Sequence, residues 1–542
     1  MARSQPYGFA CSGGLVDSAN RFDLFKAPGV ATTLRNFEVA VEGGYRRING
    51  YSLFGGGSSA RPNSSNQIYG LFVYADGVIA ASGSDIYFSQ DGTSWLEINK
   101  TTASATSTHT QMTDSTVTDA ATAINLTSPA QYSFALYEGT STYGDLVMAD
   151  ASGNNKPFLF RMNGTGANIT SRTFLGKQIT ISGSTTAKFC TIHGRRLVVA
   201  GDPSTPNTVY ISAVNDIDDF TGGVSITLED QIVGLKSLRN ELFIFCKNSI
   251  FKLQNVDNSS ALQVVPVTKN VGCLDGQSIQ EFGGDLIFLA PDGLRTVAGT
   301  ARIGDVELGT ISKAIQPQIK QIADNIDTFT ISSVVLRDKS QYRLYYGKSS
   351  QSDLIQEGII GTLRPEGWQW SETRGIEAPA VTSGFSNTGV EKAFHGDFAG
   401  YVYNHDTGNS FNPAGTESDI DAQYTTPDID YGDLGMLKTL QYLKISFSPE
   451  NDATPTIRVR YDFESTDTPQ PADISLGTVP LPSLFGSAVF NTNTFGAGEH
   501  PTVRTALTGS GHSNNFSIFT KNTNQPYIIN GLYIDYVPSG RR

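Results

Sequence analysis

The feature that most constrains this fold is a strand unit that recurs along the chain without a fixed motif. Residues 194–212, 240–253 and 284–297 each carry a turn, a short apolar strand, a second turn and another strand. Short strands that recur in this way are typical of a β-propeller, in which small sheets stand around a central axis. One fold hosts many functions, so the rest of the chain must supply the function.

The same unit extends along most of the chain and predicts about six blades. Sets of strands are expected at 68–98, 131–184, 187–229, 230–268, 271–309 and 331–403. A strand near 45–54 is expected to pair with the last blade, because closing the ring leaves no long exposed edge. A short helix is expected at 312–323, where Ile315, Ile319 and Ile322 fall on one face.

The fold class is therefore all-β, with the chain divided into three parts. Residues 1–45 are interpreted as an N-terminal arm that crosses over the body or reaches a neighbouring subunit. Residues 46–415 form the propeller body, with an extended Ser- and Thr-rich insertion near 101–128. Residues 416–542 form a C-terminal β domain resembling a sandwich, because strands at 420–425 and 457–461 alternate apolar and polar residues.

Charge and cysteine content narrow the classes of function. The formal net charge of −13 argues against high-affinity binding to nucleic acid. It does not exclude a surface along which DNA slides without sticking, and solubility alone explains the charge equally well. Cys246 lies inside an apolar strand and no CxxC pair is present, which predicts reduced, buried thiols. The first residues lack an apolar signal region and no apolar run spans a membrane, so the expected site of synthesis is a cytoplasm.

A search for catalytic or metal-binding motifs finds one weak candidate. His395 and Asp397 lie close in sequence to His405 and Asp406. A metal site there needs a further ligand and convergent geometry, and turn residues at a blade edge are the favoured interpretation. No nucleophile elbow, Walker loop, zincin motif or zinc-finger spacing is present. The sequence therefore predicts no catalytic, cofactor-binding or metal-binding residues and no enzymatic activity.

Two aromatic features admit a carbohydrate interpretation. Residues 89–95 (SQDGTSW) resemble the Asp-box of sialidase-like propellers, although the spacing is one residue short and one copy is present. That box is a structural hairpin turn, and a glycosidase would also need paired carboxylates facing a pocket. Trp368 and Trp370 share one side of a strand and could stack on a sugar, but packing in a blade core is the favoured interpretation.

A run of acidic residues occupies the junction before the last domain. It contains Glu417, Asp419, Asp421, Asp428, Asp430 and Asp433. Calcium loops use such residues, but their regular spacing is absent here. A solvated, repulsive face is therefore the favoured interpretation.

Ordered segments along residues 35–440 resemble one virion family. They are LRNF at 34–37, GYRRINGY at 44–51, GRRL at 194–197, VYISAVND at 209–216 with DF at 219–220, IVGL at 232–235, VGC at 271–273, DKSQYRL at 338–344, HGDFAG at 395–400, and TPDIDYGD at 426–433 with Lys438. The chain thereby resembles the tail hub or nozzle proteins of short-tailed bacteriophages (podoviruses), also called tubular tail protein B or packaged-DNA stabilisation proteins. The last hundred residues match less well.

The resemblance implies a structural subunit of the virion. Such subunits form a homo-hexameric ring that extends the DNA exit channel below the portal and adaptor proteins. The ring retains packaged double-stranded DNA, which passes through the lumen without specific binding, and anchors tail fibres or spikes. The family supplies no catalytic residues. It implies assembly in the bacterial host cytoplasm, location in the phage tail and no stable membrane insertion.

Two other hypotheses remain open at this point. One is a carbohydrate-binding or glycan-degrading β-propeller of the sialidase-like Asp-box type, which a pocket with paired carboxylates would favour. The other is a host-encoded propeller that serves as a scaffold for other proteins, which the neighbouring genes would distinguish from a phage protein.

Overall fold

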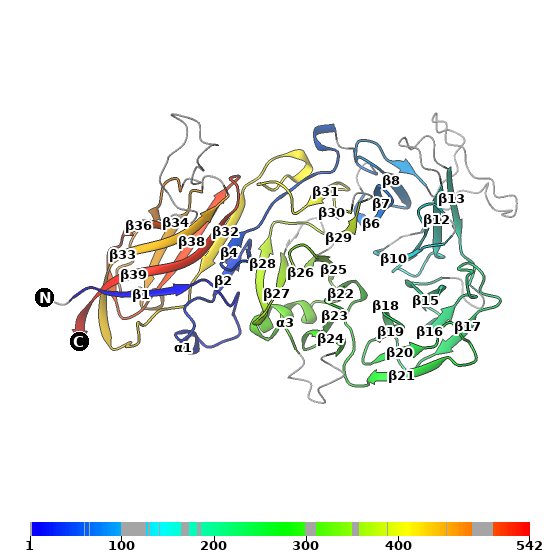
Figure 1. The fold of residues 1–542 in the computed structure, drawn as a ribbon, viewed down its shortest axis with the longest axis horizontal. Coiled ribbons are helices and arrows are strands. Elements are labelled where there is room, and N and C mark those ends of the chain that lie inside the picture. Colours follow the sequence, from blue (N-terminus) through cyan, green and yellow to red (C-terminus); the bar gives the residue numbers. More distant parts are fainter. Residues whose placement is uncertain are drawn as a thin grey trace.

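The computed structural model describes residues 3–58, 60–63, 66–98, 126–127, 130–139, 141–163, 173–181, 186–298, 310–348, 357–386, 389–450, 453–479 and 502–541. Most of the insertion predicted near 101–128 lies outside these residues. Figure 1 shows a ring of small sheets joined side by side to a second body of longer strands, at whose far end both labelled chain ends lie. The structure thus confirms an all-β fold with a β-propeller.

Six small sheets stand in the ring, which confirms the expectation of about six blades. They are β6 (Ile68–Tyr74), β7 (Gly77–Ser82), β8 (Asp85–Ser89) and β9 (Leu96–Glu97); β10 (Tyr132–Tyr137), β11 (Asp145–Asp150), β12 (Phe158–Asn163) and β13 (Thr173–Gln178); β14 (Phe189–His193), β15 (Arg196–Asp202), β16 (Thr205–Ile211) and β17 (Val224–Thr227); β18 (Ile232–Leu238), β19 (Glu241–Cys246), β20 (Ile250–Gln254) and β21 (Gln263–Thr268); β22 (Gln280–Phe282), β23 (Asp285–Ala290) and β24 (Gly293–Thr296); and β29 (Ala380–Phe385), β30 (Glu391–Gly396) and β31 (Val402–His405) with β5 (Tyr51–Leu53).

The last predicted set of strands, 331–403, divides into two parts of the ring. Strands β25 (Phe329–Leu336), β26 (Gln341–Lys348), β27 (Glu357–Arg364) and β28 (Gly367–Arg374) fill the sector between β22 and β29 and continue into a nine-stranded sheet. Strand β5 pairs with β31 through Tyr403↔Leu53, so a strand from the predicted range 45–54 does close the ring.

Adjacent blades are held together by apolar side chains that pack between their sheets. The second strands β7, β11 and β15 are buried along their whole length, which explains their uninterrupted apolar runs. Between two adjacent blades, for example, Val198 and Val209 pack in one buried cluster with Leu242 and Ile244. All four cysteines are buried free thiols, and burial raises the pKa of Cys246 to about 12. These thiols serve as small apolar packing groups.

The second domain has two layers that enclose the largest buried cluster. One layer comprises β3 (Phe37–Val39), β4 (Tyr45–Arg47), β39 (Tyr527–Arg541), β33 (Met436–Pro449), β36 (Thr502–Ala506), β37 (Ser510–Gly511) and β1 (Gln5–Ala10). The other continues from β28 through β2 (Thr33–Arg35), β32 (Ile420–Thr425), β38 (Asn514–Asn522), β34 (Thr456–Tyr461) and β35 (Ile474–Ser475). Ile445 and Ile534 of the first layer and Ile518 of the second belong to the same core.

The segment predicted as an N-terminal arm crosses between the two domains. Strand β1 pairs with β39, and β2 lies between β32 and β28, with which it pairs in parallel. Helix α1 (Arg21–Leu24) lies between these strands, and α3 (Gln316–Asp324) follows a 3-10 turn η5 (Lys313–Ile315). Ile315, Ile319 and Ile322 are all buried, which confirms the predicted helix.

Asn36 joins the crossing segment to both domains. Its Nδ2 donates to the carbonyl oxygens of Arg374 at 3.0 Å and Asp421 at 2.9 Å, and its Oδ1 accepts from the Arg374 amide at 2.8 Å. Asn36 is buried and adopts a left-handed backbone with φ of 52°. Asparagine suits both demands, since its short amide side chain tolerates this backbone and can bond three main-chain groups.

The substitution Asn36→Ala is expected to cost about 2 to 4 kcal/mol of unfolding free energy, because it leaves buried backbone groups without partners. Urea unfolding of the full chain would measure it. Asn36→Gly is the matched control, and it should be less damaging than alanine by about 1 kcal/mol because glycine relieves the left-handed backbone. Alanine and glycine variants both within about 0.5 kcal/mol of wild type, by contrast, would show that these hydrogen bonds are dispensable.

Candidate functional site

A network of charged side chains is buried where the propeller meets the second domain. Glu38 on β3 accepts hydrogen bonds from Arg343 at 3.0 Å, Lys339 at 2.9 Å and Arg46 at 2.9 Å. Asp406, just after β31, accepts from Arg343 at 3.2 Å and forms an ion pair with Lys339 at 2.7 Å. We call these five residues the junction network. It ties the crossing segment, β26 and the ring-closing blade together.

The junction network keeps its acids ionised despite burial. Burial alone would raise the pKa of Glu38, but Lys339, Arg343 and Arg46 hold that pKa below its usual range although Asp406 lies nearby. The pKa of Asp406 is also lowered, because Arg343 and Lys339 outweigh the effect of burial. A buried charge is tolerated only when it is paired and hydrogen-bonded, and each acid here has several partners.

The two histidines of the predicted metal candidate meet at the edge of the junction network. His405 Nε2 lies 2.8 Å from the Tyr345 hydroxyl and 3.3 Å from Arg343 Nη1, so this nitrogen is the acceptor. His405 Nδ1 then donates to His395 Nδ1 at 3.1 Å. Burial lowers the pKa of both rings well below the ordinary histidine value, and the cations Arg343 and Lys339 lower the pKa of His405 further. The pair is therefore neutral and positions Arg343 and Tyr345.

The predicted acids do not complete a metal site around the histidines. Asp406 belongs to the junction network, and Asp397 accepts from the Tyr403 hydroxyl and the Tyr401 amide, each at 2.7 Å. Within the described ranges no group of three His, Cys, Asp or Glu side chains is placed to hold a metal ion. The favoured interpretation, residues that fix the edge of a blade, matches these contacts.

The histidine pair is expected to make the protein less stable in acid. Each ring is neutral in the folded state, whereas the unfolded chain binds a proton below about pH 6.5, so stability falls by about 1.4 kcal/mol per histidine for each pH unit below that value. Between about pH 7.5 and 5.5, urea unfolding should show the wild type losing about 2 to 3 kcal/mol more than His395→Gln/His405→Gln.

The double variant is needed because other groups titrate in the opposite direction. Burial raises the pKa of Asp275 and of Asp17 to about 6, so protonation of these acids favours the folded state in the same pH range. That contribution is common to wild type and variant and cancels in the comparison. Equal losses in the two proteins would refute the role assigned to the histidine pair.

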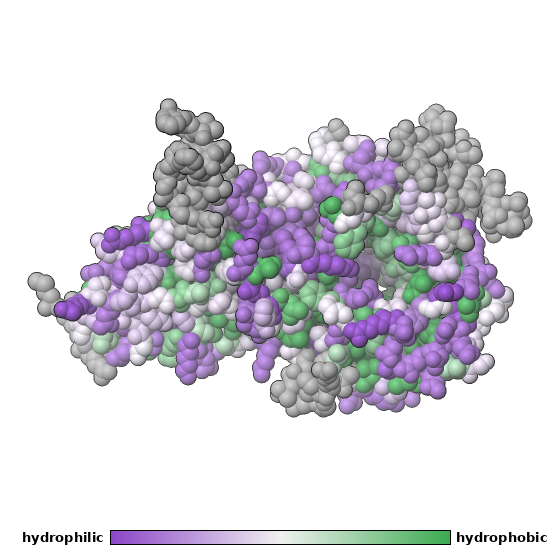
Figure 2. Space-filling view, in the orientation of Figure 1, coloured by the Kyte–Doolittle hydropathy of each residue, from purple (hydrophilic) through white to green (hydrophobic). Residues whose placement is uncertain are grey.

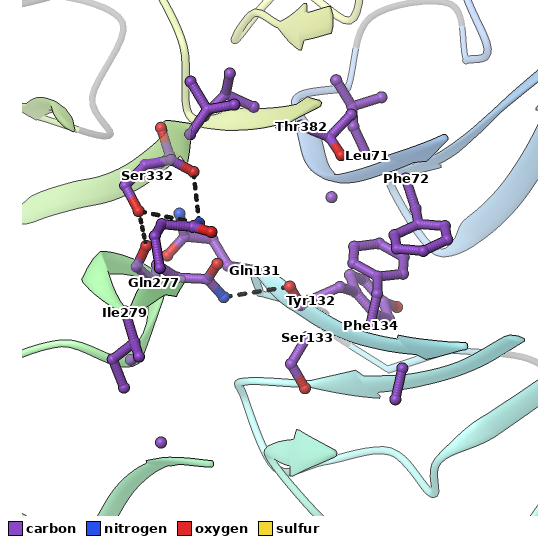
Figure 3. A pocket seen from close by; sticks show the side chains of 18 of the residues that line it. Leu71, Phe72, Gln131, Tyr132, Ser133, Phe134, Gln277, Ile279, Ser332 and Thr382 are labelled. Carbon is purple, nitrogen blue, oxygen red and sulfur yellow. Dashed lines mark hydrogen bonds between the residues drawn. The ribbon is translucent and has the colours of Figure 1, made fainter. Parts of the chain in front are cut away.

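The axis of the propeller holds a second polar site, a cavity of about 420 Å³ that we call the axial cavity. Its wall is formed by the innermost strands of the ring, from β6 through β29. Figure 2 shows a hollow in the face of the ring, and Figure 3 shows the side chains that line the cavity. The described lining contains amides, hydroxyls, aromatic rings and the cations Lys236 and Arg337, but no Asp, Glu or His.

Two glutamines cross the floor of the axial cavity. Gln131 lies just before β10. Its side chain donates hydrogen bonds to the carbonyl oxygens of Ile331 on β25, at 2.6 Å, and of Pro379, just before β29, at 2.9 Å. Gln277, in the 3-10 turn η3 (Gly276–Ser278), donates to the Tyr132 carbonyl oxygen at 3.2 Å (Figure 3). These hydrogen bonds link the beginnings of inner strands that belong to different blades of the ring. The axis is therefore narrowed at this end by amide side chains.

The tryptophan pair has a packing role. Trp370 is 1% exposed, belongs to the main core, and donates from Nε1 to the Ile311 carbonyl oxygen at 3.0 Å. Trp368 stacks on it with ring centroids 5.6 Å apart and also packs against Phe282. The favoured interpretation of a blade core is consistent with these contacts, and the buried ring of Trp370 has no face free for a sugar.

The Asp-box-like segment forms a hairpin turn. Asp91 Oδ1 accepts from the Thr93 amide at 2.9 Å, and the Ser89 hydroxyl accepts from the Gly92 amide at 2.9 Å. Trp95 packs beneath the turn against Phe54 and donates to the Ala60 carbonyl oxygen. The segment therefore stabilises the edge of one blade.

The acidic run does not form one face. Asp428 is buried and accepts from Asn515 at 3.2 Å, whereas Asp421 pairs with Arg35 at 3.6 Å. Asp430 accepts a hydrogen bond from the Gly432 amide, and Asp433 accepts one from the Gly435 amide. The expectation of a single solvated face is therefore wrong for Asp428, because the segment after β32 packs beside β38, on which Asn515 lies.

The sequence interpretation missed Glu38, Gln131, Gln277 and Lys236. For Glu38 a signal was present, since an acid sits between the apolar residues of β3 and precedes the pair Arg46 and Arg47. For the glutamines and Lys236 no local signal exists, because only ring closure brings them to one axis. No helix in the described part of the chain has the length and apolar character to cross a membrane.

Comparison with known proteins shows no relative in sequence. No protein-family model matches the chain, and no curated protein matches it. The solved structure of the AfRom2 CNH domain is similar with a TM-score of 0.34 and 10% identity, over 67% of this chain and 100% of that one. The solved structure of an exo-β-1,3-galactanase from Phanerochaete chrysosporium with galactose is similar with a TM-score of 0.26 and 10% identity, over 92% of this chain and 100% of that one. Likenesses this weak give no information about function.

Proposed function

We propose that the chain is a non-enzymatic structural subunit of the tail nozzle of a short-tailed bacteriophage. In this proposal the subunits form a closed ring, with six copies expected, below the portal and adaptor. The ring extends the DNA exit channel, retains the packaged genome and carries tail fibres or spikes. A rotational ring requires two different faces of each subunit to meet, which a molecule of two unlike domains can offer.

The observation that carries the proposal is where the nozzle-like segments lie in the fold. Segments 34–37 and 44–51 lie near the start of the sequence, far from segment 338–344, yet Asn36, Arg46 and Arg343 all act at the junction between the domains. In segment 426–433, the Asp433 carbonyl oxygen accepts a hydrogen bond from Lys438, the residue that accompanies this segment in the resemblance. Three of the segments that resemble nozzle proteins thus contribute contacts at the junction between the two domains.

Charge and the axial cavity are both consistent with this proposal. A net charge of −13 per subunit repels phosphate groups and would let DNA pass without binding. Gln131 and Gln277 cross the floor of the axial cavity, so the propeller axis does not offer a path for a duplex. In the proposed ring, DNA would pass through the lumen between subunits.

Electron microscopy of the purified full-length chain tests the proposal. We expect closed rings with an open lumen, and ultracentrifugation should give the mass of a hexamer. Mobility-shift titration with linear duplex DNA at physiological salt should show no specific complex. A chain that remains monomeric at high concentration and is absent from virions, by mass spectrometry, would refute the proposal. Neighbouring genes for a portal and a terminase would support a phage origin over a host scaffold.

A further inference from the structure

The axial cavity has chemistry that the proposed nozzle function does not use. The inner strands of the ring run in the same direction. Ser133 and Cys190, near the starts of two neighbouring inner strands, are hydrogen-bonded, and so are His193 and Ser237, near the ends of two such strands. Gln131 and Gln277 lie at the starts, whereas Lys236 and Arg337 lie at the ends. The cavity therefore has a floor of amides and a cationic mouth.

Lys236 is the cationic residue at this mouth that has no hydrogen-bond or ion-pair partner within the described residues. In the described chain it makes no hydrogen bond and no ion pair within 4 Å, whereas Arg337 is held by Glu391 at 3.1 Å. Burial lowers the pKa of Lys236, and Arg337 lowers it further, although Glu281 on β22 acts in the opposite direction. A half-buried ammonium group beside another cation favours an anionic group at the mouth.

Three amide oxygens supply acceptors in the same cavity. Gln131, Gln277 and Gln280 each use their side-chain nitrogen in a hydrogen bond to the ring. Their Oε1 atoms have no hydrogen-bond donor within the described residues. These atoms can accept hydrogen bonds from hydroxyl groups but would repel a bare anion. Phe72 and Phe134 stack at 5.3 Å on another part of the wall, and Figure 3 shows both beside the cavity.

We propose that the axial cavity binds a sugar that carries a carboxylate, such as a uronic acid unit of a polysaccharide. Lys236 would pair with the carboxylate, the glutamine oxygens would accept from ring hydroxyls, and the half-buried phenylalanine rings would contact the apolar face of the sugar. A cavity of about 420 Å³ is within the usual range for a small-molecule site. No bond is made or broken in this binding.

Calorimetric titration of the full-length chain with D-glucuronate, D-glucose and inorganic phosphate tests the proposal. We expect glucuronate to bind at least tenfold more tightly than either of the others, because only glucuronate offers both a carboxylate and hydroxyl donors. Glucose binding as tightly as glucuronate would overturn the role of Lys236. Phosphate binding as tightly would overturn the role of the amide oxygens. No binding of glucuronate would overturn the proposal altogether.

Variants locate the site. Lys236→Gln should weaken glucuronate binding about tenfold or more, while Lys236→Arg should retain most of it. Lys313→Gln removes an exposed lysine of η5, away from the axial cavity, and should leave binding unchanged; an equal loss in this control would refute the assignment. Thermal unfolding verifies that each variant is folded. These measurements do not depend on ring formation, so the nozzle proposal and the sugar proposal can fail separately.

Discussion

The substitution Arg343→Met is expected to lower the free energy of unfolding by about 3 to 5 kcal/mol. Arg343 is 1% exposed and pairs with both Glu38 and Asp406. Removing it takes one cationic partner from each of these two buried carboxylates. Methionine replaces the aliphatic part of the arginine side chain, so most of the expected loss comes from the acids left without a partner. Guanidinium or urea unfolding at neutral pH would measure the change.

Lys339→Met is the matched comparison for Arg343. Lys339 contacts the same two acids, but its side chain is 20% exposed, so water can reach the acids more easily after its removal. We expect a cost of about 1 to 2 kcal/mol there. Adding Glu38→Gln to Arg343→Met should recover part of the loss, because it removes the charge of one of the two acids that lost a partner. Equal, small effects at both positions would contradict the interpretation of the junction network as a buried, mutually dependent unit.

The substitution Trp370→Ala should also cost about 3 to 5 kcal/mol. Trp370 is fully enclosed, its ring lies over Gly361 on the paired strand β27, and its indole nitrogen is bonded to the Ile311 carbonyl oxygen. Alanine would leave a cavity and an unpaired carbonyl group in the main core. Thermal or urea unfolding should show the loss as a lower midpoint.

Trp368→Ala provides the control for that cavity. Trp368 lies on the same strand and stacks on Trp370, but it is only partly buried. Its removal should cost about 1 to 2 kcal/mol. If the tryptophans served to bind sugar rather than to pack, both alanine variants would be nearly neutral in stability, and that result would contradict a packing role for the pair.

The local sequence predicted the propeller well for a physical reason. Strands such as β15 and β19 are buried on both faces, so they appear as uninterrupted apolar runs between turns. The division of residues 331–403 was missed, because β25 to β28 form longer strands whose sheet continues into the other domain. That continuation depends on β2 pairing with β28, and no local pattern reveals a partner more than three hundred residues away.

The polar sites were harder to predict than the fold. Lys339 lies in a polar run between Asp338 and Ser340, and Arg343 follows soon after, so both are easily interpreted as surface charges. Their burial follows from the arrival of Glu38 on a segment from the opposite end of the chain. The axial cavity was hard to predict for the same reason. Gln131, Lys236 and Gln277 come from different parts of the ring, and the residues around each of them in the sequence give no sign of a binding site.

The pairing of β1 and β4 with β39 affects how the protein is made. The ring-closing strand β5 leaves the ribosome long before β31, its partner in the ring, and the propeller can close once β31 has emerged. The second domain is different, since its first strands must wait for β39 at the other end of the sequence. During that interval β1 has no strand partner and β4 is paired only with β3, and such open strand edges are prone to non-native pairing. Only a chain translated through β39 completes both domains, so chains that terminate before β39 cannot reach this fold.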